Sequence, residues 1–415
     1  MRSRSYHSRL ADDRLAELLR AFPAILINGP RATGKTTTAR QHALDTVRLD
    51  RPAEAAAFQA DPDAALQRRS EPLLLDEWQE VPEVLGAVRR AVDEDPRPGR
   101  FILTGSVRAE FEKKAWPGTG RLIRMHMHGL TEAEIRGQVG SGHRGFLDRL
   151  QKADLALFPH VAGRPTLADY VDMAVKGGFP EVALTGLSVD DAHTWLDSYL
   201  GDLITRDLKP DPRRPTQKMR EYLEALSLNT AGLPQDVTLS RAVGVTVKTV
   251  GVYDGLFEAL FITERVPAWT SNRLQRLIKS PKRYIVDSGL AAAAAGLTAA
   301  SILADGDLLG RVFDTFGTAQ LRPEVALATR MRFHHLRTKD GREEIDLVVE
   351  VAGGEVLAIE FKASAAPSAA DAKHLAWLRD LLGPRFLAGA VMHTGPTAFS
   401  LGDRLMAVPV CAIWE

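Results

Sequence analysis

The sequence predicts an α/β protein of several domains, with a parallel sheet in the first of them. Three observations lead to this expectation. The 415 residues correspond to about two or three domains of ordinary size. Hydrophobic residues make up 45% and charged residues 26% of the chain, as in globular proteins rather than disordered or fibrous ones. Between residues 23 and 135, short apolar runs alternate with helical stretches, a pattern typical of parallel sheets covered by helices.

Composition also excludes several classes of protein. No run of about 18 apolar residues is present for a transmembrane helix, and the basic N-terminus lacks the apolar core of a signal peptide. We therefore expect a cytoplasmic protein with no membrane partner. A single cysteine, Cys411, excludes an internal disulfide framework and is expected to be buried and inert. The 53 basic and 53 acidic residues cancel, so the whole chain has no broad attraction for nucleic acid.

Three apolar strands are expected in the first domain, which we place at residues 1–135. They are Ala24 to Asn28, Leu73 to Leu75 and Phe101 to Leu103, and Leu85 to Val92 suits a helix between the last two. Each strand is followed by polar residues. Because open α/β sheets bind their ligands beyond the carboxyl ends of the strands, we expect a site there.

The first of these strands ends in a phosphate-binding motif. The eight residues GPRATGKT match G-x-x-x-x-G-K-[ST] between a strand and a helix, the context that this motif requires. Backbone N–H groups would surround the β-phosphate at the positive end of the helix, with Lys35 on the β/γ-oxygens and the Thr36 hydroxyl on Mg²⁺. The expected ligands are thus ATP and Mg²⁺, held by Gly29, Pro30, Arg31, Ala32, Thr33, Gly34, Lys35, Thr36 and Thr37.

The second and third strands supply the remaining candidates for the same site. Asp76 and Glu77 follow Leu75 directly. We assign Asp76 to the metal and Glu77 to the general base that accepts a proton from the attacking water. Thr104, at the end of the third strand, is placed to hydrogen-bond the γ-phosphate or that water.

These motifs resemble the AAA-type P-loop ATPases of bacteria and archaea, in the family that joins this module to a C-terminal domain of uncharacterised role. The resemblance rests on GPRATGKT, LLLDEWQEVP and FILTGS, and it extends to GGFPEV, SPKRYIVDSGL, EIDLVVE and IEFKAS. It therefore covers nearly the whole chain and implies ATP hydrolysis. Arg121 matches a Gly-Arg pair of the family and is the first candidate for the arginine that stabilises the transition state; Arg206 is the second. Whether either acts in cis or in trans is left open.

Two segments are expected to follow the first domain. Residues 136–215 carry helical stretches near 167–175 and 190–208 and read as a helical lid or connector, which ends in a proline-rich run that cannot continue a helix. Residues 216–285 have the order helix, glycine turn, helix and hairpin that is typical of a winged helix-turn-helix. A small all-helical spacer for protein contacts is the alternative.

A basic stretch lies at the end of this third segment, with no acidic residue among its members. It could meet the phosphates of duplex DNA, or protect an exposed hairpin edge by its charge. Without DNA binding, the partners would be proteins. Its basic residues are Arg265, Arg273, Arg276, Lys279, Lys282 and Arg283, with Trp269 among them.

The C-terminal segment, residues 286–415, is expected to be a second α/β domain with its own carboxylates. Asp346 leads one strand, and Glu360 and Lys362 share a face of the next. Asp346 and Glu360 are placed to share Mg²⁺ while Lys362 orients a water, and this pattern resembles the core of PD-(D/E)XK nucleases. The matching helix offers Asp314 in place of the usual glutamate. An inactive nuclease-like fold that binds DNA or protein, and a simple surface hairpin, are the alternatives.

The sequence thus predicts a Mg²⁺-dependent ATPase that acts as a nucleotide switch on its winged helix and nuclease-like domain. An ATP-gated DNA endonuclease and a non-catalytic regulatory switch are the alternatives, and oligomer formation is left open. His126 and His128 lie two apart on an expected strand and so share a face, while the adjacent His334 and His335 point to opposite faces. Neither pair has acidic or cysteine partners at ligand spacing. We therefore expect them to be structural rather than metal-binding.

Overall fold

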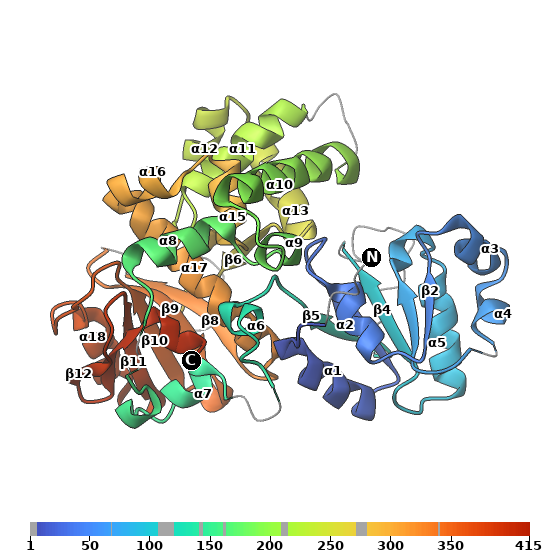
Figure 1. The fold of residues 1–415 in the computed structure, drawn as a ribbon, viewed down its shortest axis with the longest axis horizontal. Helices are drawn as coiled ribbons and strands as arrows, with labels where there is room; N and C mark the ends of the chain where they lie inside the picture. Colours follow the sequence, from blue (N-terminus) through green and yellow to red (C-terminus); the bar gives the residue numbers. More distant parts are fainter. Residues whose placement is uncertain are drawn as a thin grey trace. The chain divides into compact units, whose positions relative to one another are not determined.

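The chain folds into two compact units, described here from a computed structural model (Figure 1). The first unit consists of Met1–Leu130, Glu134–Ser141 and Ala259–Phe261, and the second consists of Thr131–Ala133, Gly142–Glu258 and Ile262–Glu415. The structure describes residues 6–67, 69–106, 120–140, 144–160, 163–208, 215–270, 280–338 and 341–415.

A parallel sheet of five strands forms the centre of the first unit, which confirms the predicted fold class. The strand order is β2-β3-β4-β1-β5, so that β4 lies between the two strands that end at the loop motif and at Asp76. Of the outer strands, β2 was not predicted, and β5 was expected only as the strand that carries His126 and His128, because neither is an apolar run. The bounds are β1 Ala24–Asn28, β2 Asp45–Arg48, β3 Leu73–Asp76, β4 Phe101–Gly105 and β5 Ile123–His126.

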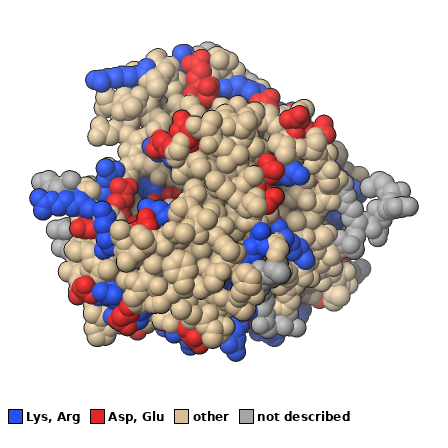
Figure 2. Space-filling view, turned by 60° about the vertical axis from the view of Figure 1, so that its left-hand side comes forward, with Lys and Arg blue, Asp and Glu red and all other residues tan. Residues whose placement is uncertain are grey.

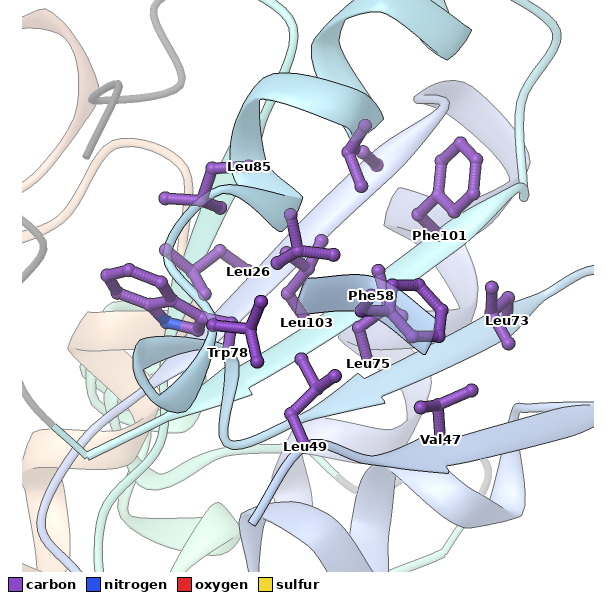
Figure 3. Packing of buried hydrophobic residues seen from close by; sticks show 14 of the residues in the cluster. Leu26, Val47, Leu49, Phe58, Leu73, Leu75, Trp78, Leu85, Phe101 and Leu103 are labelled. Atoms are coloured by element: carbon purple, nitrogen blue, oxygen red, sulfur yellow. The ribbon is translucent and has the colours of Figure 1, made fainter. Parts of the chain in front are cut away.

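One face of this sheet is covered by a continuous apolar core, which Figure 3 shows. Phe58 and Leu85, from two different helices, pack with Leu75 and Leu103 of the central strands, and all four side chains are buried. Burial of such side chains contributes about 1.5 to 3 kcal/mol each, which fixes the strand ends that carry the site. The helices of the unit are α1 Leu10–Ala21, α2 Lys35–Gln41, α3 Pro52–Ala60, α4 Pro62–Leu66 and α5 Val84–Glu94.

The second unit begins with helices and ends its first half in a short hairpin. In the part that we predicted to be a winged helix-turn-helix, α11 Thr216–Leu228, α12 Asp236–Val243 and α13 Val247–Ala259 precede the antiparallel strands β6 Thr263–Val266 and β7 Lys282–Ile285. Gly244 ends α12 with a left-handed backbone, which favours glycine. The other helices are α6 Glu132–Ile135, which lies partly in the first unit, α7 Phe146–Leu150, α8 Leu167–Lys176, α9 Pro180–Ala183, α10 Val189–Asp202, α15 Ser288–Ala294 and α16 Ala299–Ala304.

A mixed six-stranded sheet forms the C-terminal part of the second unit. Its order is β12-β13-β11-β10-β9-β8, with β10, β11 and β13 parallel and the other neighbours antiparallel. Helix α17 Gly306–Leu327 extends at both ends beyond the predicted helix, and α18 Lys373–Leu382 packs against β11. The strands are β8 Arg332–Arg337, β9 Glu344–Glu350, β10 Val356–Phe361, β11 Phe386–His393, β12 Phe399–Gly402 and β13 Leu405–Pro409. Among the described residues, we find no helix with the length and apolar character that crossing a membrane requires.

Candidate nucleotide site and C-terminal carboxylate cluster

The loop between β1 and α2 has the backbone that the motif predicts. Gly29, Ala32 and Gly34 have positive φ angles of 145°, 62° and 91°. A Cβ atom on Gly29 would lie 2.0 Å from the Met127 carbonyl oxygen, so only glycine fits where the loop passes the chain that follows β5. The Thr33 hydroxyl donates to the Pro30 carbonyl at 2.8 Å and closes the loop from inside.

Lys35 is buried against its own loop. Its Nζ donates to the carbonyl oxygens of Gly29, at 3.1 Å, and Pro30, at 2.6 Å, and the residue is 5% exposed. Burial lowers the pKa of Lys35 to about 8, because desolvation of the ammonium outweighs the attraction of Glu77. Arg31, within the loop motif, and Thr37, directly after it, are exposed.

Asp76 joins three elements at the carboxyl edge of the sheet. The hydroxyls of Thr36, on α2, and Thr104, on β4, both donate to its Oδ1, at 2.7 and 2.5 Å. Asp76 is 1% exposed, and Arg48 Nε lies 3.9 Å from its Oδ2. The structure therefore brings three of the predicted site residues into direct contact. A hydroxyl and a carboxylate are oxygen donors of the kind that Mg²⁺ takes, so this pair fits the predicted metal.

Glu77 turns away from the strand in a left-handed backbone, with φ 55° and ψ 52°. Gln79 Nε2 donates to Glu77 Oε2, a contact that the sequence did not suggest. Trp78 packs beside β4, where a Cβ atom on Gly105 would lie 2.3 Å from the indole Nε1. The glycine that ends β4 thus makes room for the residues that follow Asp76.

Neither candidate arginine is drawn into the nucleotide site by the contacts that the structure shows. Arg121 forms an ion pair with Asp93 of α5, at 2.7 Å, and its side chain is 48% exposed. Arg206, in the second unit, pairs with Asp202 at 3.4 Å and is 76% exposed. Exposed pairs of this kind contribute at most about 1 kcal/mol, so both side chains can leave them at little cost.

Arg9 is a component of the site that sequence reasoning missed. Its Nη1 donates to the carbonyl of Thr33 in the loop at 2.9 Å, and its Nη2 donates to His128 O at 2.9 Å. Its Nε pairs with Glu134 Oε1 at 2.8 Å, and both side chains are buried. A lone arginine before α1 carries no sequence signal, because its partners lie 24 to 125 positions away in the chain.

The histidines lie in structural positions. His126 ends β5 and its Nδ1 lies 2.9 Å from Asn28 Oδ1. His128 lies beyond the strand end, which corrects the prediction that both share one strand, and its ring centroid is 4.3 Å from that of His126. His334 and His335 are buried on β8. In the described ranges, no group of three or more His, Cys, Asp or Glu side chains has an arrangement that would hold a metal ion.

The C-terminal carboxylates surround a buried lysine. Lys282 Nζ lies 2.5 Å from Asp314 Oδ2 and 3.0 Å from Asp346 Oδ1. Burial raises the pKa of Asp314 to about 6, because desolvation outweighs the attraction of Lys282. Asp346 also loses solvation, yet Lys282 and the N–H of Phe361 hold its pKa below the usual value.

Glu360 and Lys362 lie beside this cluster, as the strand alternation predicts. Lys362 Nζ is 3.7 Å from Glu360 Oε2, and its side chain is 40% exposed. Burial, with the adjacent Asp346, raises the pKa of Glu360 well above the usual value. Glu360 Oε1 is buried and accepts no hydrogen bond from the described residues.

The structure corrects the interpretation of the basic stretch for several of its members. Lys282 and Arg283 are buried rather than available to phosphates, and Arg283 pairs with Asp236 and Asp254. Arg265 pairs with Asp254 and Glu258, and Trp269 is buried. Lys282 and Arg283 are neighbours on β7, so their side chains point to opposite faces of the strand, and each pairs with acidic residues that lie far away in the sequence. Arg273, Arg276 and Lys279 lie outside the described residues.

Three family models match separate parts of the chain. Residues 21–136 match a family described as an AAA domain. Residues 167–301 and 309–413 match two different families, each described as a domain of unknown function. Uncharacterised proteins of Mycobacterium bovis and Mycobacterium tuberculosis are each 29% identical over 408 residues, which is 97% of this chain and 83% of theirs.

Two solved structures are also similar. A Walker-type ATPase of Pyrococcus abyssi has a TM-score of 0.41 and 13% identity, and the match covers 70% of this chain and 96% of that one. AMPPCP-bound DnaA from Aquifex aeolicus has a TM-score of 0.28 and 14% identity, with 62% and 89% covered. The AAA-domain match, together with the loop, the buried Asp76 and the parallel sheet, confirms the expected resemblance to AAA-type P-loop domains over residues 21–136, and residues 309–413 match a domain family of unknown function.

Proposed function

We propose that the first unit binds ATP together with Mg²⁺ and hydrolyses it to ADP and phosphate. The observation that carries this proposal is the convergence of the Thr36 and Thr104 hydroxyls on the buried Asp76 carboxylate, since Thr36 directly follows the loop lysine, Lys35. Such a convergence of hydroxyls and carboxylate at the end of a phosphate-binding loop suits metal-assisted phosphoryl transfer.

Each group of the loop has a role in binding. Backbone N–H groups of residues 29–36 receive the β-phosphate. Lys35 now contacts two loop carbonyls, and phosphate oxygens replace these as its partners on binding. Thr36 and Asp76 would hold Mg²⁺, which when bound neutralises charge on the β- and γ-phosphates.

The reaction consumes one water molecule. The water oxygen forms a bond to the γ-phosphorus while the bond from that phosphorus to the β,γ-bridging oxygen breaks, so that the electron pair leaves with ADP. Glu77 accepts the proton of the attacking water, and Thr104 orients the water or the γ-phosphate. Arg121 stays our first candidate to stabilise the transition state, since its surface pair with Asp93 leaves it able to move.

Steady-state ATP turnover with Mg²⁺ tests the proposal. We expect Lys35→Ala to abolish nucleotide binding, and Glu77→Gln to retain binding while lowering kcat by about 100-fold or more. Glu80→Gln is the matched control, because Glu80 is exposed three residues away. Absence of ATP binding to the wild-type protein, or full turnover in Glu77→Gln, would refute the assignment.

We further propose that turnover serves as a switch for the second unit, with duplex DNA or a protein as partner. Turnover measured with and without duplex DNA tests the first partner, and neutralisation of Arg273 and Lys279 should weaken binding most at low salt. Figure 2 shows basic and acidic residues interspersed on the visible face, so a DNA surface would be local. The endonuclease alternative requires a metal on Asp346, where Lys282 already lies.

A further inference from the structure

We infer that the Lys282 ammonium is the resident cation of the C-terminal carboxylate cluster and takes the place that a divalent metal would have in a nuclease. The cluster consists of Asp314, Asp346 and Glu360, and it lies wholly within the second unit. This inference is independent of the proposed ATPase activity. It assigns the cluster a structural role, as the anchor of the hairpin β6–β7.

Geometry is the first argument. Lys282 Nζ lies between carboxylates of two elements, 2.5 Å from Asp314 on α17 and 3.0 Å from Asp346 on β9. These are the distances of charge-assisted hydrogen bonds. The lysine side chain is 5% exposed, so the surrounding chain shields its charge from solvent.

Hydrogen-bond accounting is the second argument. All four oxygens of the two aspartates already accept bonds from the chain. Besides Lys282, Asp314 Oδ1 accepts from the hydroxyls of Tyr284 and Thr318, each at 3.0 Å. Asp346 Oδ2 accepts from the Phe361 N–H, also at 3.0 Å. Both aspartates are therefore satisfied by the chain itself, and a metal ion placed between their carboxylates would have to displace Lys282 Nζ.

Charge is the third argument. Two lysines, Lys282 inside the cluster and Lys362 at its edge, face the three carboxyl groups. Removal of one partner from a buried ion pair leaves an uncompensated charge and is strongly destabilising. The chain therefore supplies the positive charge that the carboxylates need. Its source, Lys282 on β7, belongs to the basic stretch for which the sequence suggested contact with phosphates.

The position of Lys282 gives the contact a consequence for the fold. Lys282 lies on β7 and pairs in register with Val266 of β6. Its bonds to α17 and β9 thus tie the hairpin to the C-terminal sheet. Glu360 Oε1 is buried without a hydrogen bond from the described residues. It would contribute to a metal site only in a protein that lacks Lys282, because the aspartate oxygens that Lys282 now occupies would then be free to bind the ion with it.

Metal titration of the full-length wild-type protein without nucleotide is the first test. By calorimetry or electron paramagnetic resonance, we expect no Mn²⁺ bound at the carboxylate cluster, so that Asp346→Asn leaves Mn²⁺ binding unchanged. We also expect no metal-dependent nicking of duplex DNA. Stoichiometric Mn²⁺ binding that disappears in Asp346→Asn would overturn the inference. This measurement does not depend on whether any variant of Lys282 folds.

A pair of lysine variants is the second test. We expect Lys282→Met to lower the melting temperature by many degrees and to gain a Mn²⁺-dependent recovery that wild type lacks, whereas Lys362→Met should change the melting temperature little. Lys248→Met, at an exposed position of α13, is the control for loss of a lysine. The inference fails if Lys282→Met melts like wild type, or if Lys362→Met is the more damaging change.

Discussion

At the scale of single residues, Lys35 is placed where the proposed nucleotide site needs a positive charge, and its burial there lowers the stability of the fold. The loop buries its ammonium and lowers its pKa to about 8. At pH 7 the lysine is charged in both folded and unfolded chains, so the folded protein bears the full desolvation penalty. Between about pH 8 and 10.5, the folded form loses the proton before the unfolded form does, and stability rises with pH.

We therefore predict that Lys35→Met stabilises the nucleotide-free protein at pH 7, by about 3 kcal/mol in the free energy of unfolding. The difference from wild type should shrink as the pH rises from 8 to 10. Urea unfolding at pH 7 and pH 9.5 measures both effects. Equal stability of the two proteins at pH 7 would show that the ammonium is compensated within the loop.

Arg9 also acts at the residue scale. Arg9→Ala removes the partner of the buried Glu134 carboxylate and the donor to Thr33 in the loop. We predict a loss of about 3 to 5 kcal/mol in unfolding free energy and a raised KM for ATP, with kcat less affected because no reacting group is changed. Arg20→Ala, exposed at the end of α1, is the control. Arg9→Lys should recover part of the stability and leave KM raised, since a lysine cannot reproduce the fork of donors.

At the scale of elements, the close approach of the loop to the chain after β5 is decided by one glycine. In Gly29→Ala, the new methyl group would collide with the Met127 carbonyl in a backbone conformation that favours glycine. We predict loss of ATP binding and a destabilisation of several kcal/mol. Gly86→Ala in α5, where the nearest atom is 3.4 Å from the new Cβ, should instead stabilise by about 0.5 to 1 kcal/mol. Equilibrium dialysis with ATP and urea unfolding give the two readouts.

Elements also show where sequence patterns succeed. Residues 24–27 of β1 and 356–359 of β10 are buried, continuous apolar runs, and burial on both faces makes such strands visible from composition. The strands β2 (DTVR) and β5 (IRMH) lie at the sheet edges and are only half-buried. Edge strands need no apolar run, so composition did not indicate β2, and it indicated β5 only as the strand expected around His126 and His128.

At the scale of the whole molecule, the switch proposal makes a prediction about both units. Hydrogen exchange with MgATP should slow the amides of residues 29–36, since bound phosphate protects their N–H groups. If turnover acts on the second unit, exchange in residues 216–285 should also differ between the MgATP and ADP states. Glu77→Gln, which we expect to bind without turnover, holds the ATP state for the measurement. Changes confined to the first unit would contradict the switch while leaving ATP binding intact.

The sequence by itself determined the phosphate-binding loop, the carboxylate pair at 76 and 77, the parallel first sheet and the α/β class of the C-terminal part, because local spacing and apolar runs indicate each of them. Only the tertiary structure decided the contacts of Arg9 with the loop and of Lys282 with Asp314 and Asp346. Lys282 lies 32 and 64 positions from its two partners. The sequence does not show which groups surround a charged side chain, because folding brings its neighbours together from distant positions. The same lysine would be a phosphate contact on an exposed hairpin and is an internal counter-ion in a buried one.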